Sequence, residues 1–139
     1  MILLDTNVVS ELWKAAPDAR VSAWANAQAI ETLYLSAVTV AELRFGVAAL
    51  PAGKRRTGYD DRLEREILPA FSGRVLSFDL DASRAYAALM AKAKAAGHAM
   101  SMADGYIAAI ATAHGLTVAT RDGAFTRTGV KAINPWRDD

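Results

Sequence analysis

The stretch MILLDTNVVSEL, residues 1–12, decides how the rest of the chain is interpreted. Its apolar residues Ile2 to Leu4 predict a short buried strand, and a carboxylate follows at once at Asp5. The first basic residue that could pair with this charge is Lys14. A carboxylate beside a buried strand destabilises a fold unless another group neutralises it or donates hydrogen bonds to it. The opening stretch therefore predicts that a partner for Asp5 comes from elsewhere in the fold.

The composition is that of a globular protein. The chain has 139 residues, 53% hydrophobic and 22% charged, which is enough for one domain with its own core. It has no cysteine, which excludes disulfides and zinc–thiolate sites, and its 2 histidines are too few for a histidine-rich metal site. Apolar stretches fall short of the roughly 20 residues of a membrane span, and no signal-like leader opens the chain. We expect one cytoplasmic domain, residues 1–139, without membrane contact.

The net charge of +1 favours neither nucleic acid nor any other partner. One basic run, Lys54 to Arg56, lies in the stretch LPAGKRRTG, which contains proline and glycine. We interpret this stretch as a solvated loop, and a patch that contacts phosphates is the alternative.

Predicted strands and helices alternate along the chain, with no hairpin signal between strands. Strands are expected at residues 2–4, 32–38, 74–78, 116–120 and 130–134. Helices are expected at residues 8–13, 18–27, 39–50, 59–71, 82–96 and 101–114, the last ended by Gly115. This alternation predicts an α/β fold in which a mostly parallel sheet is covered by helices on both faces.

Four acidic residues follow predicted strands or open predicted helices: Asp5, Glu42, Asp104 and Asp122. Each has an ordinary structural explanation. Asp5 could be the N-cap of the next helix, and Asp122 lies in the turn sequence RDG. Glu42 fits a capping box with Thr39 in TVAE, and Asp104 fits one with Ser101 in SMAD.

Topology nevertheless favours a shared site for these four carboxylates. In right-handed βαβ units, the carboxyl ends of strands and the amino ends of the following helices lie at one edge of the sheet. Carboxylates that converge there repel one another unless a cation neutralises them. Oxygen ligands without cysteine or histidine select Mg²⁺ or Mn²⁺. A divalent metal is therefore our expected partner for Asp5, and Asn7 and Thr120 are expected to orient the ligands.

The helix behind Asp104, GYIAAIATA, is apolar or small on nearly every face and is therefore expected to be buried. Its carboxylate would then open on a cleft with Arg121 as the main nearby cation. Asp79 and Asp81 also follow a strand, but we leave them outside the site and expect one of them to cap the next helix.

Carboxylates with a divalent metal suit the hydrolysis of phosphodiesters by an activated water. A haloacid-dehalogenase phosphatase is a rival interpretation, but it needs a second aspartate where this chain has Asn7. A receiver domain needs an acidic pair after the first strand, where this chain has one acid. A non-catalytic or DNA-associated regulatory module that works with a DNA-binding partner is the remaining alternative.

The motifs themselves resemble those of PIN-domain ribonuclease toxins, the VapC-like proteins and their FitB-like subgroup. MILLDTNVVSEL, with Asp5 and Asn7, resembles the opening motif, and LSAVTVAEL, with Glu42, resembles the second. ADGYIAAIA, TVATRDGAF and NPW resemble the later motifs, in the expected order along the chain.

The resemblance implies a three-layer α/β/α sandwich, Mg²⁺ or Mn²⁺, and metal ligands at Asp5, Glu42, Asp104 and Asp122. It also implies an RNA substrate, a homodimer, and inhibition by an antitoxin that carries the toxin to operator DNA.

The predicted helices at residues 39–50 and 59–71 are rich in apolar side chains, namely Leu43, Phe45, Val47, Leu50, Leu63, Ile67, Leu68 and Phe71. We expect this pair to form a groove for an antitoxin peptide, with a neighbouring surface closing the dimer. The alternative is that all of these side chains face the core.

Overall fold

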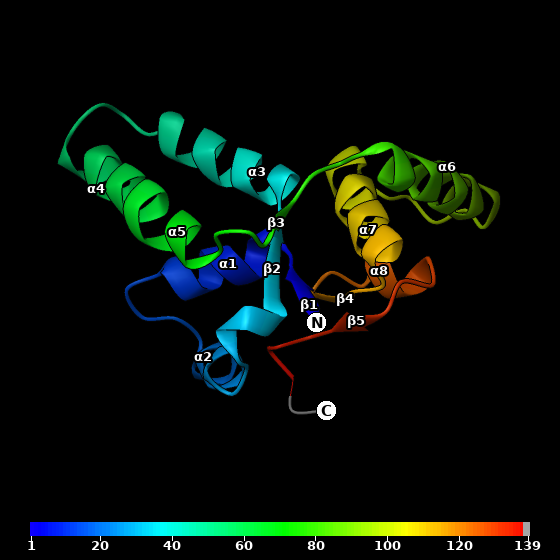
Figure 1. Ribbon diagram of the computed structural model, residues 1–139, viewed down its shortest axis with the longest axis horizontal. Helices are drawn as coiled ribbons and strands as arrows, with labels where there is room; N and C mark the ends of the chain where they lie inside the picture. The colour runs from blue at the N-terminus through cyan, green and yellow to red at the C-terminus, as the bar shows by residue number, and fades with distance from the viewer. Residues whose placement is uncertain (138–139) are drawn as a thin grey trace.

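A sheet of parallel strands lies at the centre of the molecule in the computed structural model, which describes residues 1–137 (Figure 1). The strands are β1 (Ile2–Leu4), β2 (Leu33–Ser36), β3 (Val75–Leu76), β4 (Thr117–Ala119) and β5 (Ala132–Ile133). Their order across the sheet is β3-β2-β1-β4-β5, and every neighbouring pair is parallel. In this register, Leu3 of β1 lies opposite Tyr34 and Val118. The predicted parallel α/β fold is confirmed.

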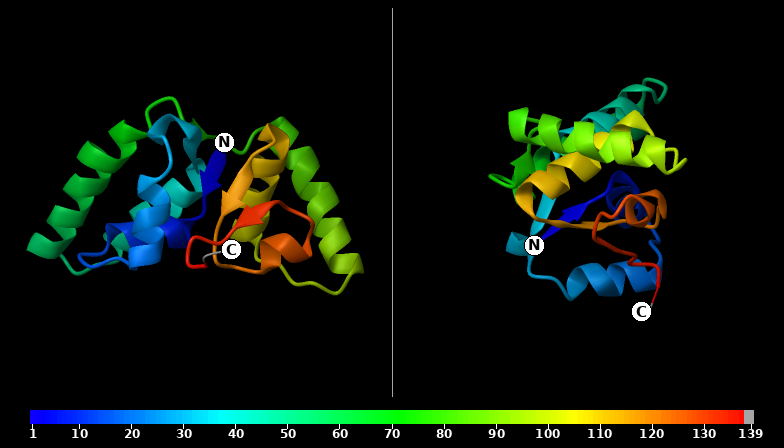
Figure 2. Two further views of the ribbon diagram at one scale, coloured as in Figure 1. Left: turned by 90° about the horizontal axis from the view of Figure 1, so that it is seen from below. Right: turned by 90° about the vertical axis from the view of Figure 1, so that its right-hand side faces the viewer.

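Helices cover both faces of this sheet (Figure 2). They are α1 (Thr6–Trp13), α2 (Ala19–Asn26), α3 (Ala37–Ala48), α4 (Lys54–Arg62), α5 (Leu68–Ala70), α6 (Leu80–Ala95), α7 (Met102–His114) and α8 (Ala124–Arg127). A 3-10 turn (Ile30–Thr32) precedes β2, and a π-helical turn (Leu63–Ile67) joins α4 to α5. In the described part of the chain, no helix is long and apolar enough to span a membrane.

Two hydrophobic cores lie on the two faces of the sheet. Leu4 of β1 packs with α1, α3 and the α4–α5 arm, whereas its neighbour Leu3 packs with α6, α7 and α8. Successive strand residues point to opposite faces, so one short strand serves both cores. The helix α7 is buried over Ile107–Ala111, as its apolar sequence predicted.

Several helix ends follow the sequence signals. Ser101 caps α7, with Asp104 N–H donating to its Oγ over 3.1 Å. Gly115 ends this helix in the left-handed conformation (φ 66°), which glycine adopts without a Cβ clash. Asp79 caps α6 by accepting a hydrogen bond from Ala82 N–H at 2.9 Å.

The predicted capping box of Thr39 and Glu42 is wrong. The helix α3 begins at Ala37, two residues earlier than expected, because Ser36 at the end of β2 is the N-cap. Thr39 N–H donates to Ser36 Oγ over 2.9 Å, so Thr39 is a helical residue and not the cap. Glu42 lies beyond the first turn of α3 and its side chain is available for other contacts.

The loop predicted around the basic run is also wrong. Lys54 opens α4, so that Lys54 to Arg56 form the exposed first turn of a helix that extends through the π-helical turn to Ala70. The short helix α8 was not predicted at all.

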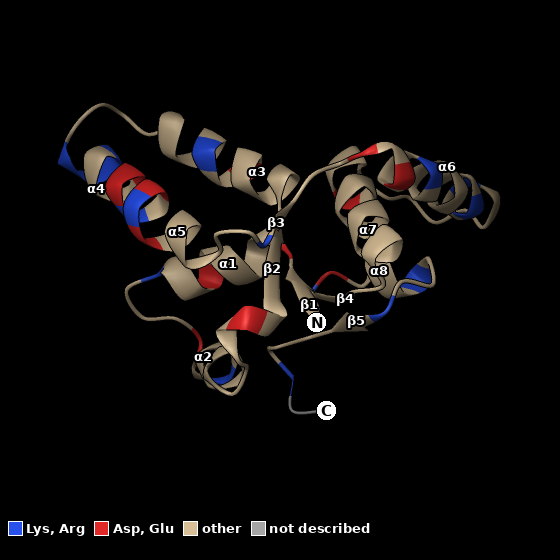
Figure 3. Ribbon diagram, in the orientation of Figure 1, with Lys and Arg blue, Asp and Glu red and all other residues tan. Residues whose placement is uncertain are grey.

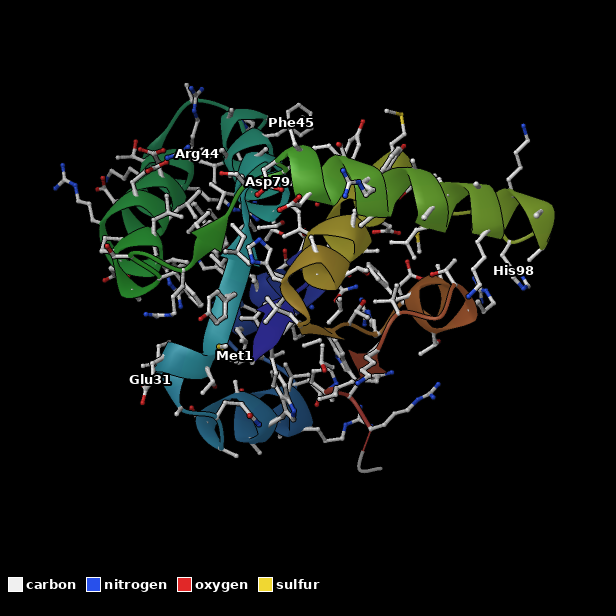
Figure 4. All side chains as sticks on the ribbon, turned by 45° about the vertical axis from the view of Figure 1, so that its right-hand side comes forward. Met1, Glu31, Arg44, Phe45, Asp79 and His98 are labelled. Carbon is white, nitrogen blue, oxygen red and sulfur yellow. The ribbon has the colours of Figure 1, made fainter. Side chains whose placement is uncertain are left out.

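Several of the apolar residues expected to line a docking groove also belong to the core. Leu43, Val47, Leu63 and Phe71 are buried. Phe45 is the exception, because 74% of it is exposed and it projects from the outer side of α3 (Figure 4).

Candidate active site

Asp5 lies at the carboxyl end of β1, where it is also the N-cap of α1. Only 4% of the residue is exposed, yet its carboxylate is held by neutral donors. Thr6 N–H donates to Oδ1 over 2.8 Å, and Thr120 Oγ1 and Asn7 Nδ2 donate to Oδ2 over 2.7 and 3.2 Å. Burial raises the pKa of Asp5, and these hydrogen bonds from Thr120 and Thr6 oppose the rise. Residues of the chain therefore orient this charge without neutralising it.

Thr120 reaches Asp5 because β1 and β4 continue their pairing past the ends of both strands. Asp5 N–H donates to Ala119 O over 2.9 Å, which places the next residue of β4 beside the Asp5 side chain. Thr120 Oγ1 also accepts from Asp122 N–H at 3.0 Å and from Asn7 Nδ2 at 3.3 Å. The two predicted supporting residues thus surround Asp5.

Asn7 carries an unsatisfied acceptor in this arrangement. Its amide nitrogen is used by Asp5 and Thr120, whereas its Oδ1 is buried and has no hydrogen-bond partner among the described residues. A buried carbonyl oxygen without a donor is unfavourable, and such atoms are often completed by a water or an ion.

Asp104 and Asp122 share a hydrogen bond across the cleft. Burial, the charge of Asp5 and this hydrogen bond to Asp122 raise the pKa of Asp104 to about 6. Asp122 is fixed by its own turn, in which its Oδ1 accepts from Ala124 N–H at 2.9 Å. Asp104 is therefore protonated more readily than an ordinary aspartate when no cation is bound.

Glu42 reaches the same region from α3 with a more exposed side chain. Thr6 Oγ1 donates to its Oε1 over 2.6 Å and lies 3.1 Å from Thr39 Oγ1. Its charge adds to the rise in the pKa of Asp5. The hydroxyl network of α1 and α3 thus positions Glu42, the glutamate that the sequence analysis included among the four site carboxylates and for which a capping box was the alternative explanation.

All four predicted carboxylates line one cleft of ≈ 450 Å³ at the carboxyl edge of the sheet. Its lining residues are Asp5, Thr6, Asn7, Ser10, Glu11, Lys14, Glu42, Asp104, Arg121 and Asp122. Figure 3 shows acidic positions after β1, on α7 and in the loop after β4, in the middle of the molecule. Within residues 1–137, however, no three His, Cys, Asp or Glu side chains are already grouped closely enough to hold a metal ion.

Sequence reasoning missed Glu11 in this cleft. It lies one helical turn after Asn7 on α1, is 7% exposed, and accepts hydrogen bonds from Lys14 Nζ (3.0 Å) and Asp18 N–H (3.1 Å). The hydrogen bonds from Lys14 and Asp18 lower its pKa. The signal that could have found it is the spacing of four residues from Asn7, which places both side chains on one face of a helix.

The donor set of the cleft fits a hard divalent cation. Carboxylates and an amide oxygen are the ligands that Mg²⁺ and Mn²⁺ prefer, and the described cleft offers no sulfur or imidazole ligand. The unused Oδ1 of Asn7 and the mutual repulsion of Asp5, Asp104 and Asp122 are what such an ion, with its water shell, would relieve.

A shallower groove of ≈ 240 Å³ adjoins this acidic cleft between α1, α3 and α4. Its floor is apolar, with Trp13, Leu43, Val47 and Leu50, and it shares Thr6, Ser10, Lys14 and Glu42 with the cleft. A groove is therefore present beside the site, although its apolar side chains also belong to the core.

The order of these elements and the acidic edge of the sheet define a known class of protein. The chain belongs to the PIN-domain family, whose profile matches residues 2–131.

Two relatives and a solved structure are similar over nearly the whole chain. VapC ribonuclease Y4jK of Sinorhizobium fredii is 68% identical over 137 residues, which cover 98% of both chains. Toxin FitB of Neisseria gonorrhoeae is 52% identical over 139 residues, which cover 99% of this chain and 100% of FitB. The structure of FitAB bound to the IR36 DNA fragment matches with a TM-score of 0.96 and 48% identity, over 100% of this chain and 98% of the other.

Proposed function

We propose that this chain is a divalent-metal-dependent endoribonuclease that acts as the toxin of a toxin–antitoxin pair, with the whole chain working as one nuclease domain. The observation that carries the proposal is the meeting of Asp5, Asp104 and Asp122 in one cleft, where burial and mutual charge raise the pKa of two of them. The relatives named VapC ribonuclease and Toxin FitB support the same activity.

In this proposal, Asp5, Glu42, Asp104 and Asp122 hold Mg²⁺ or Mn²⁺. The chemistry that such an ion supplies is the activation of water for attack on phosphorus and the neutralisation of phosphate charge. Asn7 and Thr120 are supporting residues, because they fix the oxygens of Asp5. The unused Oδ1 of Asn7 is available to a water of the ion's hydration shell.

The chain's own residues prepare the cleft before substrate arrives. Thr6 fixes two carboxylates at once, since its N–H holds Asp5 and its hydroxyl holds Glu42. Because α1 and α3 carry these groups on rigid elements, the oxygens are oriented in advance, which reduces the reorganisation needed during reaction. Because the pKa of Asp104 is raised to about 6, any proton that this carboxyl carries is displaced when a cation binds, so cation binding and proton release are linked.

We propose a cognate antitoxin as the protein partner of this chain. The groove between α1, α3 and α4 opens into the acidic cleft, so a bound peptide could carry a basic side chain to the carboxylates and silence them. We further propose a homodimer that joins the antitoxin on operator DNA. The structure of FitAB bound to a DNA fragment supports the DNA-bound part of this assembly.

The direct test is cleavage of a single-stranded RNA pool by the purified chain in Mg²⁺, in Mn²⁺ and in excess EDTA. We expect cleavage that EDTA abolishes, with 5′-phosphate and 3′-hydroxyl ends, because water that attacks phosphorus displaces the 3′ oxygen and leaves the phosphate on the 5′ end of the downstream fragment. An Asp5→Asn preparation made in parallel controls for contaminating nucleases. Products with cyclic phosphate ends, or full activity in EDTA, would overturn the metal-dependent mechanism.

A further inference from the structure

A second cleft lies on the other side of the loop that carries Asp122. Its volume is ≈ 330 Å³, within the size range of small-ligand sites, and Thr126, Ala132, Asn134 and Arg137 contribute to its lining. Arg121 and Asp122 line this cleft and the acidic cleft, so the two clefts share a wall. None of the roles proposed above uses this second cleft, which we call the β5 cleft.

The charge of the lining changes sign across this wall. The acidic cleft is lined by five carboxylates and two cations, namely Asp5, Glu11, Glu42, Asp104 and Asp122 with Lys14 and Arg121. Among residues 1–137, the charged side chains that line the β5 cleft are Arg121, Arg137 and one carboxylate, Asp122. A polyanion is therefore repelled by the first cleft until a cation binds there, whereas it is attracted to the second in any state.

Arg121 is held in place by an aromatic ring and not by a carboxylate. Its Cζ lies 4.7 Å from the ring centroid of Trp136, and among the described residues no acidic group lies within ion-pair distance of it. Trp136 is itself anchored, because it is partly buried against the hydrophobic core and its backbone N–H donates to Asn134 Oδ1 over 2.9 Å. Stacking on the ring orients the guanidinium while leaving its N–H donors available for a ligand.

We propose that Arg121 binds a phosphate of single-stranded RNA next to the scissile phosphate, and that the β5 cleft holds the nucleotide attached to it. This inference rests on the proposed nuclease function. A guanidinium matches phosphate geometry, and RNA that is read by proteins commonly splays single bases onto Arg planes and into small polar pockets. Trp136 is a positioning residue, since it acts through Arg121.

If Arg121 has this role, replacing it should weaken RNA binding without slowing the chemical step. Arg121→Ala should raise KM for cleavage of a random-sequence single-stranded RNA pool about ten-fold or more and leave kcat unchanged. The reason is that a contact with a phosphate outside the reacting group is equally strong in the ground state and in the transition state. In the Asp104→Asn background, which is not expected to cut, the slope of log Kd against log salt between about 50 and 200 mM should fall in magnitude by about 0.7.

Three further variants sharpen the test. Arg127→Ala removes another exposed arginine, on α8, that lines neither cleft, and should leave KM and the salt slope as in the wild type. Trp136→Leu should raise KM about two- to five-fold, the loss expected for an exposed cation–π contact. Arg121→Lys should keep the wild-type salt slope but only part of the wild-type affinity for RNA, because lysine keeps the positive charge but lacks the planar guanidinium that stacks on Trp136.

The outcomes separate this inference from the function on which it rests. If the wild type neither binds nor cuts the pool, the nuclease proposal fails and the RNA subsite fails with it. If the wild type does both and Arg121→Ala matches it in KM and salt slope, only the subsite is wrong. If Arg121→Ala weakens the antitoxin complex but not RNA binding, the β5 cleft belongs to the protein partner and the inference is also overturned.

Discussion

At the scale of single residues, the central feature is a buried carboxylate that the chain orients but does not neutralise. Asp5 accepts three hydrogen bonds from neutral groups, and its nearest charged neighbours in the cleft are other acids. Such an arrangement lowers the stability of the ion-free protein, because repulsion among carboxylates is retained in the folded state. Function and stability are therefore opposed at this edge of the sheet.

This opposition predicts a stabilising effect of Asp104→Asn. The pKa of Asp104 rises from 3.8 to about 6 on folding, so the folded state binds this proton more tightly than the unfolded chain does. Its contribution to the free energy of unfolding therefore falls as pH rises from about 4 to 6, and the full cost is present above that window. In EDTA at pH 7, the variant should be about 1–2 kcal/mol more stable, less than the full shift implies because the residue is partly exposed.

Urea unfolding of both proteins at pH 7 and pH 4 measures this difference. The gain should largely disappear at pH 4, which is close to the unfolded-state pKa of 3.8 and well below the folded-state pKa of about 6, and saturating Mg²⁺ should stabilise the wild type more than the variant. A gain of the same size at both pH values would mean that charge repulsion is not its cause.

Sequence reasoning placed the four acids at one edge by topology alone, and the structure lines one cleft with them. It did not find Glu11, because the spacing of four residues from Asn7 places both side chains on one face of a helix but does not show that the glutamate is buried. That burial depends on Lys14 and on the chain entering α2 at Asp18, which only the folded arrangement brings together.

At the scale of elements, the start of α3 shows how a strand-to-helix junction builds part of the site. Ser36 ends β2 and caps α3, and its hydroxyl donates a hydrogen bond to Thr39 Oγ1. Thr39 Oγ1 in turn lies beside the hydroxyl of Thr6, which donates a hydrogen bond to Glu42. The TVAE motif satisfied the capping pattern, but the serine one turn earlier competed for the same role and is fully buried. The local sequence pattern alone does not distinguish Ser36 from Thr39 as the N-cap of α3.

The two serine caps should therefore differ in what they contribute. Ser36→Ala should lower the free energy of unfolding by about 1–2 kcal/mol, because it leaves buried Thr39 N–H without an acceptor. Ser101→Ala, at the exposed start of α7, should cost only about 0.5–1 kcal/mol. Thermal unfolding of the two variants beside the wild type measures the difference, and equal losses would contradict the importance of the buried junction.

The long arm formed by α4, the π-helical turn and α5 marks the limit of prediction at this scale. The apolar spacing of residues 59–71 predicted its second half, since Leu63 and Phe71 are buried against the sheet. The first turn at Lys54 was missed because its residues are all exposed, so no hydrophobic periodicity distinguishes it from a loop.

At the scale of the whole molecule, the groove between α1, α3 and α4 joins the acidic cleft to the surface proposed for the antitoxin. Gly46 lines this groove, and a Cβ added there would meet no other atom within 4 Å. A large side chain at this position should therefore fill the groove without disturbing the helix.

Gly46→Phe should weaken inhibition by the antitoxin while leaving RNA cleavage and thermal stability close to those of the wild type. Gly58→Phe is the matched control, because Gly58 lies on α4 with equally open space and does not line the groove. Titration of each toxin variant with the antitoxin, followed by RNA cleavage, gives the two inhibition curves. Unchanged inhibition of Gly46→Phe would place the antitoxin on another surface.

The claim on which the rest depends is that the carboxylates of the cleft cut RNA with a divalent cation. The most direct measurement is the rate of RNA cleavage by Asp104→Asn in saturating Mg²⁺, compared with Asp81→Asn, an exposed aspartate in the first turn of α6 outside the cleft. We predict that Asp104→Asn reduces the rate to the EDTA background while Asp81→Asn cleaves as the wild type does. Cleavage by Asp104→Asn at the wild-type rate, in a protein that remains folded, would contradict the account.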